Sequence, residues 1–179
     1  MKEYSLKVEE LSSHISELKA GDKVYLSGTV YTARDAAHKK FFELIEKGKR
    51  LPFPIKNSVI YFAGPTPTPE NLAIGSCGPT TSSRMDPYSP KLYDMGLLAT
   101  IGKGERSLEV IDAIKRNKAV YFCAIGGAGA LASLNIKECE VIAFEELGCE
   151  SVKRLVFKDF PLFVGIDSFG NEIFKNLRF

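Results

Sequence analysis

The sequence predicts a mixed α/β domain in which helices pack on a central sheet. Three observations lead to this prediction. Strand-like and helix-like segments alternate through the middle of the chain, both ends are rich in strand-like segments, and 179 residues suffice for one domain to bury its own core. Hydrophobic residues make up 45% of the chain and charged residues 26%, as in an ordinary globular protein. We therefore expect a single domain over residues 1–179.

The first half of the chain contains two expected strands with a helix between them. Residues 23–30 alternate apolar and polar side chains after a Gly-Asp turn signal, which predicts a strand. Apolar residues recur at three- and four-residue steps through residues 34–47, and Gly48 ends the pattern, which predicts a helix. Residues 58–63 form an apolar run typical of a buried strand. The proline-rich residues 64–69 then start a long loop that reaches to about Pro90.

The second half continues the alternation. Residues 107–115 place apolar side chains on one helical face, and residues 119–125 form an apolar strand that runs into a glycine cluster. Residues 140–144 predict a further strand. At the C-terminus, the strand-like segments 154–157 and 162–166 are followed by a turn signal at 167–171 and a short final strand at 172–174. This arrangement indicates a hairpin.

Composition excludes several classes of protein. The net charge is +2 and the basic residues are scattered, so there is no concentrated basic stripe of the kind that binds nucleic acid. The N-terminus is polar and acidic rather than basic and then apolar, and no apolar run approaches the ~18 residues of a membrane span. We expect a cytoplasmic protein that binds neither nucleic acid nor membrane.

The cysteines and histidines do not predict a metal site within this chain. There is no Cys-x-x-Cys pair, and only two histidines could assist a metal. We expect Cys123, inside an apolar run, to be buried and inert. Cys77 differs because it lies in a glycine-flanked loop beside the most polar motif of the chain. The four cysteines are Cys77, Cys123, Cys139 and Cys149.

Arg34 is the first candidate binding residue, because it follows an expected strand and opens an expected helix. Amide groups at a helix start attract anions, and a guanidinium adds a two-pronged donor suited to a carboxylate. A solvated arginine beside Asp35 is an equally acceptable interpretation. His38, four residues on, either supports Arg34 or covers the helix, and we favour the structural role.

The loop at residues 78–84 is the second candidate. It holds four hydroxyls and one guanidinium, a density that suits a small oxygen-rich anion; these residues are Thr80, Thr81, Ser82, Ser83 and Arg84. A phosphate cradle is one possibility, but the Gly-Lys-Ser/Thr spacing of a nucleoside triphosphate site is missing. A Ser/Thr turn that satisfies its own backbone is the structural alternative.

Two glycine-rich segments complete the candidates. Lys103 lies between two glycines, which let it reach out of a tight turn, although such a lysine is usually only solvated. The glycine cluster at 126–129 follows a strand, and Glu145 and Glu146 come about twenty residues later, which imitates a dinucleotide-binding fingerprint. Close backbone packing explains these glycines better, so a dinucleotide site is the more distant alternative.

Taken together, these segments resemble the β subunit of class I fumarate hydratase and L-tartrate dehydratase, the fumarase C-terminal domain family. The resemblance covers nearly the whole chain. It rests on five motifs in order, at residues 27–39 (SGTVYTARDAAHK), 78–85 (GPTTSSRM), 102–104 (GKG), 124–130 (AIGGAGA) and 167–171 (DSFGN). It implies a swivelling β/β/α domain with a mixed central sheet flanked by helices.

The resemblance also implies a hydro-lyase that works with a cysteine-containing α subunit, as an α2β2 heterotetramer. That partner, and not this chain, would carry a 4Fe–4S cluster. Because the chain starts with Met1 just ahead of the matching region, we expect a separate β subunit. Carried over residue by residue, Arg34, Arg84 and Lys103 would bind the substrate carboxylates, with Thr81 beside them. Thr80 would act at the proton-transfer end, and Thr81 is the alternative for that role.

The substrate implied by the resemblance is a C4 dicarboxylate. Fumarate and (S)-malate, a reaction of the tricarboxylic acid cycle, are the first expectation, and an L-tartrate dehydratase β subunit is the alternative. A methylated C4 diacid would satisfy the same cationic side chains. The charged side chains alone do not distinguish among these diacids.

Overall fold

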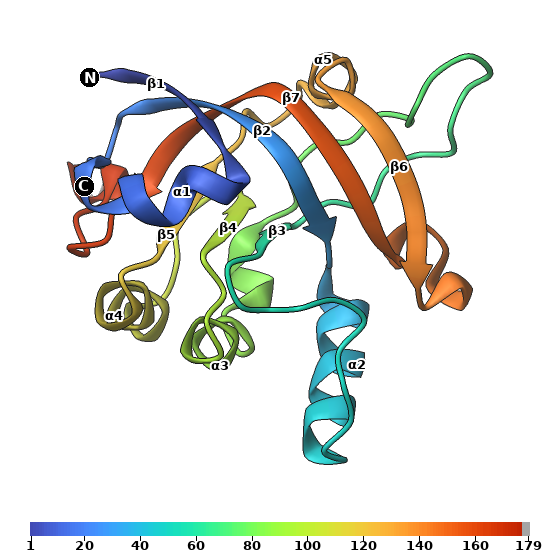
Figure 1. Ribbon diagram of the computed structural model, residues 1–179, viewed down its shortest axis with the longest axis horizontal. Coiled ribbons are helices and arrows are strands. Elements are labelled where there is room, and N and C mark those ends of the chain that lie inside the picture. Colours follow the sequence, from blue (N-terminus) through green and yellow to red (C-terminus); the bar gives the residue numbers. More distant parts are fainter. Residues whose placement is uncertain (177–179) are drawn as a thin grey trace.

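The protein is built on one seven-stranded sheet, seen in a computed structural model that describes residues 1–176 (Figure 1). The mixed α/β class that the sequence predicts, with a central sheet and flanking helices, is confirmed. The strands are β1 Glu3–Lys7, β2 Lys23–Thr32, β3 Val59–Tyr61, β4 Ala99–Gly102, β5 Val120–Cys123, β6 Ile136–Ala143 and β7 Val152–Ile166.

The helices are short and lie between the strands. None of those within residues 1–176 is long and apolar enough to cross a membrane. The α-helices are α1 Val8–His14, α2 Asp35–Glu46, α3 Ser89–Asp94, α4 Leu108–Asn117 and α5 Gly129–Ser133. Four 3-10 helices complete the list, namely η1 Ile15–Glu17, η2 Ser82–Met85, η3 Glu145–Glu150 and η4 Ile173–Asn176.

The strand order is β1-β2-β3-β4-β5-β7-β6, and β1 to β5 pair in parallel. β7 runs antiparallel to β5 and β6, and it also pairs antiparallel with β2. The β2–β7 pairing closes β2, β3, β4, β5 and β7 into a ring, which leaves β1 and β6 as outer strands. Closure pairs strand edges that would otherwise be exposed.

Two hydrophobic clusters follow from the alternation of side chains along the strands. In β3, Val59 and Tyr61 enter a first cluster inside the ring, while Ile60 faces the opposite side. There it joins a second cluster, to which α2, α3 and α4 contribute side chains such as Phe41 and Tyr93. Strands buried on both faces have continuous apolar sequences, which is why residues 58–63 show no polar alternation. Figure 1 shows α2, α3 and α4 along the same side of the sheet.

Three details differ from the sequence-based expectations. Segments 154–157 and 162–166 form one long strand, β7, rather than two. The turn at 167–171 is present, but the expected strand at 172–174 is wrong, since Glu172 forms only one bridge, to Ile166, before η4 begins. The Asp167 carboxylate accepts the turn's backbone N–H groups and thereby ends the ladder. β6 begins at Ile136, earlier than expected. Most side chains in the first part of this outer strand are solvated, so its sequence shows no apolar alternation there.

Candidate active site

The predicted site residues all lie at the carboxyl edge of the parallel strands. Arg34 follows β2, the loop with Thr80 and Thr81 lies between β3 and β4, and Lys103 directly follows β4. The glycine cluster at 126–129 follows β5. Because β2 to β5 are parallel, their carboxyl ends meet at one edge, the usual place for a binding site in an α/β sheet. Figure 1 shows β2 leading directly into α2 at this edge.

Hydrogen bonds bring the threonine loop against the end of β4. The backbone N–H of Thr80 donates to the carbonyl of Phe62 at 2.7 Å. Thr81 pairs with Lys103 in a parallel bridge, and the N–H of Ser82 donates to the Lys103 carbonyl at 3.0 Å. The two threonines and the lysine, twenty-odd residues apart in sequence, are therefore neighbours.

Arg84 lies in η2 and reaches the first turn of α2. Its Nη1 is 4.0 Å from Asp35 Oδ2, and the two side chains are 58% and 40% exposed. This pair changes the interpretation of Asp35, because the aspartate lies beside Arg84 rather than neutralising Arg34. The pair also places Arg84 near Arg34, since Arg34 is the residue that precedes Asp35.

Arg34 is the N-cap residue of α2, and its guanidinium forms an ion pair that the sequence did not predict. Nη2 lies 3.0 Å from Glu150 Oε1 in η3, and each side chain is 20% exposed. The other carboxylate oxygen of Glu150 accepts the N–H of Ala36 at 3.2 Å. A solvated Arg34 is therefore the wrong interpretation. Glu150 gave no sequence signal, because more than one hundred residues separate it from Arg34.

His38 has the structural role that we favoured. Its Nδ1 lies 2.8 Å from the Arg34 carbonyl, and the imidazole packs among the rings of Phe41, Phe62 and Tyr88. Burial lowers the pKa of His38 to about 4, so the ring is neutral near pH 7. Since the carbonyl can only accept, Nδ1 carries the proton and His38 supports the backbone at Arg34.

A buried arginine, Arg106, binds the segment that follows η2. Arg106 Nε donates to Asp86 Oδ1 at 2.6 Å, and Nη2 donates to Ser89 Oγ, also at 2.6 Å. The second oxygen of Asp86 accepts the N–H of Ser107 at 2.7 Å. This network fixes the segment after η2 to the loop after β4. Sequence reasoning missed it, because Arg106 beside a glycine turn looks like any solvated arginine.

Tyr121 makes a second connection beneath the site. Its hydroxyl donates to the Gly104 carbonyl at 2.9 Å and lies 2.9 Å from Ser82 Oγ. Burial raises the pKa of Tyr121 well above its usual range, so the hydroxyl keeps its proton. One side chain of β5 thus joins the threonine loop to the turn that carries Lys103.

The topology removes the dinucleotide hypothesis. That fingerprint needs a second strand beside and parallel to the first, whereas β7 lies between β5 and β6 and runs antiparallel to both. α5 has only five residues, and Glu146 is engaged by Lys40 at 2.7 Å. Gly129 has a packing role, since a Cβ there would lie 2.9 Å from the backbone nitrogen of Gly78. Close packing thus accounts for Gly129, as expected from sequence.

No group of three or more His, Cys, Asp or Glu side chains in residues 1–176 could hold a metal ion, so these residues do not fit an iron–sulfur cluster. Burial raises the pKa of Cys77 to about 12, which makes its thiol unreactive despite its position beside the polar loop. Cys123 is half-buried rather than buried, and burial raises its pKa to about 11. Cys149 is exposed.

The site is open. Thr81, Arg84 and Lys103 are exposed, and Thr80 and Arg34 are partly buried beside them. Three cations on such a surface suit an anion with more than one carboxylate. Two cavities of about 460 and 480 Å³ lie elsewhere, one beside Phe53 and one beside Phe169.

Comparisons with known proteins show the family of the chain. Residues 1–177 match the family described as Fumarase C-terminus. The chain is 41% identical over 170 residues to "Fumarate hydratase 2" of Leishmania major, covering 94% of this chain and 30% of that protein. It is 39% identical over 173 residues to "Fumarate hydratase class I, aerobic" of Escherichia coli, covering 96% of this chain and 32% of that protein.

A third relative is nearer in length. The chain is 38% identical over 170 residues to the "Putative L(+)-tartrate dehydratase subunit beta" of Methanocaldococcus jannaschii, covering 92% of this chain and 87% of that protein. In contrast, the chain spans about a third of the length of the fumarate hydratases that it matches. Since the family match covers almost every residue, the chain belongs to the Fumarase C-terminus family.

Proposed function

We propose that this chain is the β subunit of an iron–sulfur-dependent hydro-lyase that reversibly adds water to a C4 dicarboxylate. The observation that carries the proposal is the grouping of Arg34, Arg84 and Lys103 with the Thr80–Thr81 pair at one open edge of the sheet. Fumarate and (S)-malate are the proposed substrates, because the fumarate hydratases named above are similar over nearly the whole chain. L-tartrate is the alternative, supported by the tartrate dehydratase β subunit.

The proposal includes a partner. We assign the 4Fe–4S cluster to a cysteine-containing α subunit in an α2β2 heterotetramer. Residues 1–176 contain no group of three or more His, Cys, Asp or Glu side chains that could hold a metal ion, and the name of one relative contains "subunit beta". The exposure of Thr81, Arg84 and Lys103 supports a site that a second chain covers. The cluster, when bound by the partner, would supply a Lewis acid for the substrate's oxygen atoms.

The residues of this chain divide into binding and proton-transfer groups. Arg34, Arg84 and Lys103 bind the substrate carboxylates through charge-assisted hydrogen bonds. The same cations stabilise the extra negative charge that develops on a carboxylate when the neighbouring carbon loses its proton. Their value to catalysis is greatest at that step, because the charge on the carboxylate is then largest.

Thr80 is the proposed proton-transfer residue, and Thr81 assists substrate binding. Thr80 is the more buried of the two, and its backbone is fixed by the Phe62 carbonyl. A threonine hydroxyl is too weak a base by itself, so it needs a carboxylate that takes its proton. The partner subunit would supply that carboxylate.

The test is an anaerobic assay of the chain reconstituted with its α subunit against fumarate, (S)-malate and L-tartrate. We expect the isolated chain to be inactive and the complex to turn over one of these acids. Arg84→Ala should raise KM and lower kcat, since a lost charge-assisted hydrogen bond costs about 1.5–3 kcal/mol.

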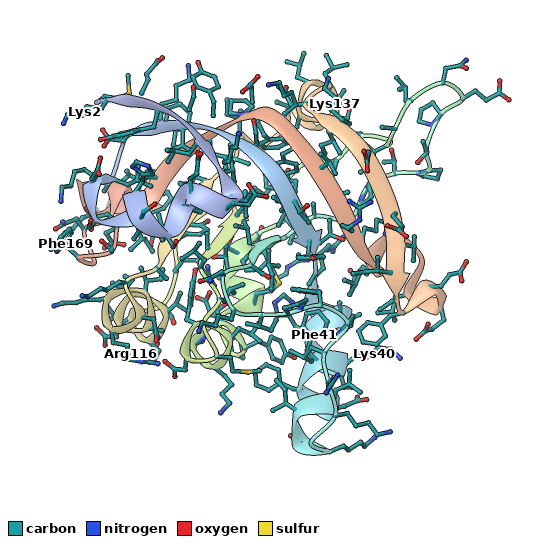
Figure 2. All side chains as sticks on the ribbon, in the orientation of Figure 1. Lys2, Lys40, Phe41, Arg116, Lys137 and Phe169 are labelled. Atoms are coloured by element: carbon teal, nitrogen blue, oxygen red, sulfur yellow. The ribbon has the colours of Figure 1, made fainter. Side chains whose placement is uncertain are left out.

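Arg116→Ala is the matched control. Arg116 is also about half-exposed and paired with an aspartate, Asp94, but it lies in the last turn of α4, just before β5 begins (Figure 2). It is therefore near the amino edge of the sheet, opposite the site. Turnover by the isolated chain, or equal kinetics for Arg84→Ala and the wild type, would contradict the proposal.

A further inference from the structure

We infer that Glu150 is a positioning residue of this site, whose carboxylate holds the Arg34 guanidinium against the first turn of α2. The inference rests on the proposed function, because Arg34 binds a substrate carboxylate there. Glu150 belongs to η3, the last element before β7, which packs beside α2, so that its side chain meets Arg34 at the start of that helix. It has no proposed contact with substrate and acts through Arg34.

The carboxylate of Glu150 bridges two groups of different kinds. Oε1 lies 3.0 Å from Arg34 Nη2, and Oε2 accepts the backbone N–H of Ala36 at 3.2 Å. Each oxygen thus has its own partner, and both partners belong to the start of α2. A negative charge at a helix N-terminus is also favourable. The side chain of Arg34 is in this way fixed relative to its own helix.

This ion pair differs from the surface pairs of the protein in burial. Arg34 and Glu150 are each 20% exposed, whereas Arg116 and Asp94 are 49% and 42% exposed. Gly64 lets Arg34 pass closely, because a Cβ at that position would lie 3.0 Å from Arg34 Nη1 and 3.2 Å from its Cδ. A long side chain held in this manner loses little conformational freedom when an anion binds.

η3 is itself fixed to the end of β2. The buried ammonium group of Lys153 donates to the Cys149 carbonyl at 3.1 Å and to Ser151 Oγ at 2.7 Å. The backbone N–H of Lys153 donates to Thr32 Oγ1 at 3.0 Å, and that hydroxyl donates to the Ser151 carbonyl at 3.3 Å. Thr32 is two residues before Arg34. Glu150 and Arg34 are therefore held by the same end of β2.

Arg34 keeps donors for a substrate. Nη2 is engaged by Glu150, whereas the Nε–H is buried and donates to no atom of residues 1–176. Nη1 lies beside Gly64, which has no side chain to cover it. The side chain as a whole stays 20% exposed. The guanidinium is therefore oriented by one carboxylate, and its exposed part can bind another.

Charge and positioning predict opposite effects on substrate affinity. Glu150 is an anion near the site of a dianion, so its charge alone would weaken binding, and its removal would lower KM. If Glu150 orients Arg34, its removal raises KM. The direction of the change in KM therefore separates the two effects.

The experiment compares Glu150→Ala with Glu146→Ala in the reconstituted α–β complex. Glu146 is the matched control, because it also lies in η3 and also bonds to α2, through Lys40 at 2.7 Å. We expect Glu150→Ala to raise KM about tenfold or more, with Glu150→Gln intermediate because its single amide oxygen can accept only one of the two hydrogen bonds and carries no charge. Glu146→Ala should leave KM within twofold of the wild type.

A double-mutant cycle identifies the route of the effect. In an Arg34→Ala background, Glu150→Ala should not raise KM, since the positioning effect passes through Arg34 and only the removal of a negative charge remains. An unchanged or lowered KM in the single Glu150→Ala variant would overturn the inference. Independent, additive effects of the two substitutions would overturn it as well.

Thermal unfolding of the full chain separates this inference from the proposed function. If the wild-type complex turns over none of the C4 acids, the proposed function fails. The Arg34–Glu150 anchor is then measured by the shifts in Tm of the two single variants and the double variant. Non-additive shifts would retain the anchor, and additive shifts would refute it.

Discussion

The buried imidazole of His38 makes stability depend on pH in a direction that the structure fixes. Burial lowers its pKa from 6.5 to about 4, so the folded state keeps the ring neutral while the unfolded chain binds a proton below pH 6.5. The unfolded state then holds more protons, and unfolding becomes easier as the pH falls. The stability contribution of the neutral ring is complete above pH 6.5 and is lost progressively between pH 6.5 and about pH 4.

The size of the loss follows from the same shift. Each pH unit over which only the unfolded state is protonated lowers the free energy of unfolding by about 1.4 kcal/mol. Lowering the pH from 6.5 to 5 therefore lowers it by about 2 kcal/mol. His38→Phe removes this term and keeps an aromatic ring beside Phe41 and Phe62. It loses the side-chain hydrogen bond to Arg34, at a cost of about 1 kcal/mol, while the backbone N–H of residue 38 still donates to that carbonyl.

The wild type should therefore be more stable than His38→Phe at pH 7.5 and less stable at pH 5. Urea unfolding followed by circular dichroism at both pH values measures this crossing. His14 is the only other histidine, and His14→Gln is the control, which should retain the pH dependence of the wild type. If His38→Phe and the wild type lose stability in parallel between pH 7.5 and pH 5, the imidazole is not buried and neutral as described.

Three further predictions concern the site and its thiols. Thr80→Ala in the assembled complex should lower kcat by ~100-fold or more with KM within a few-fold, whereas Thr81→Ala should be milder; unchanged turnover per folded Thr80→Ala molecule would leave only a structural role. Lys103→Ala should raise KM, and Lys103→Arg should restore most of the affinity if charge is what matters, as steady-state kinetics would show. Iodoacetamide should modify the exposed Cys149 in the native protein and the buried Cys77 only after denaturation; rapid native labelling of Cys77, detected by mass spectrometry, would contradict its burial.

The sequence determined the local elements that carry the site. Period-two alternation gave β2, helical spacing gave α2, and the polar residues of the 78–84 loop stood out by composition. These signals are local because they depend on residues a few positions apart. The order of five motifs also sufficed to recognise the family. The expected mixed α/β class follows from the same alternation of strands and helices.

Short or solvated elements were less predictable. β4 has four residues, too few to establish a period, and β6 is an outer strand with mostly solvated side chains. The prediction of a final strand at 172–174 was wrong because the side chain of Asp167 accepts backbone N–H groups that a hairpin would have paired with the other strand. Side-chain competition of this kind leaves no mark on hydrophobic periodicity.

Only the tertiary structure decided how the charged residues of the site are held. The pairing of β2 with β7 closes the sheet and brings η3 to the start of α2, so that Glu150 meets Arg34. The network around Arg106 arises in the same way, from loops that follow different strands. Sequence determines which residues have the chemistry for a site, because that depends on residue type and local spacing. Which charges face one another depends on strand order, and strand order is fixed by contacts between residues that are distant in sequence.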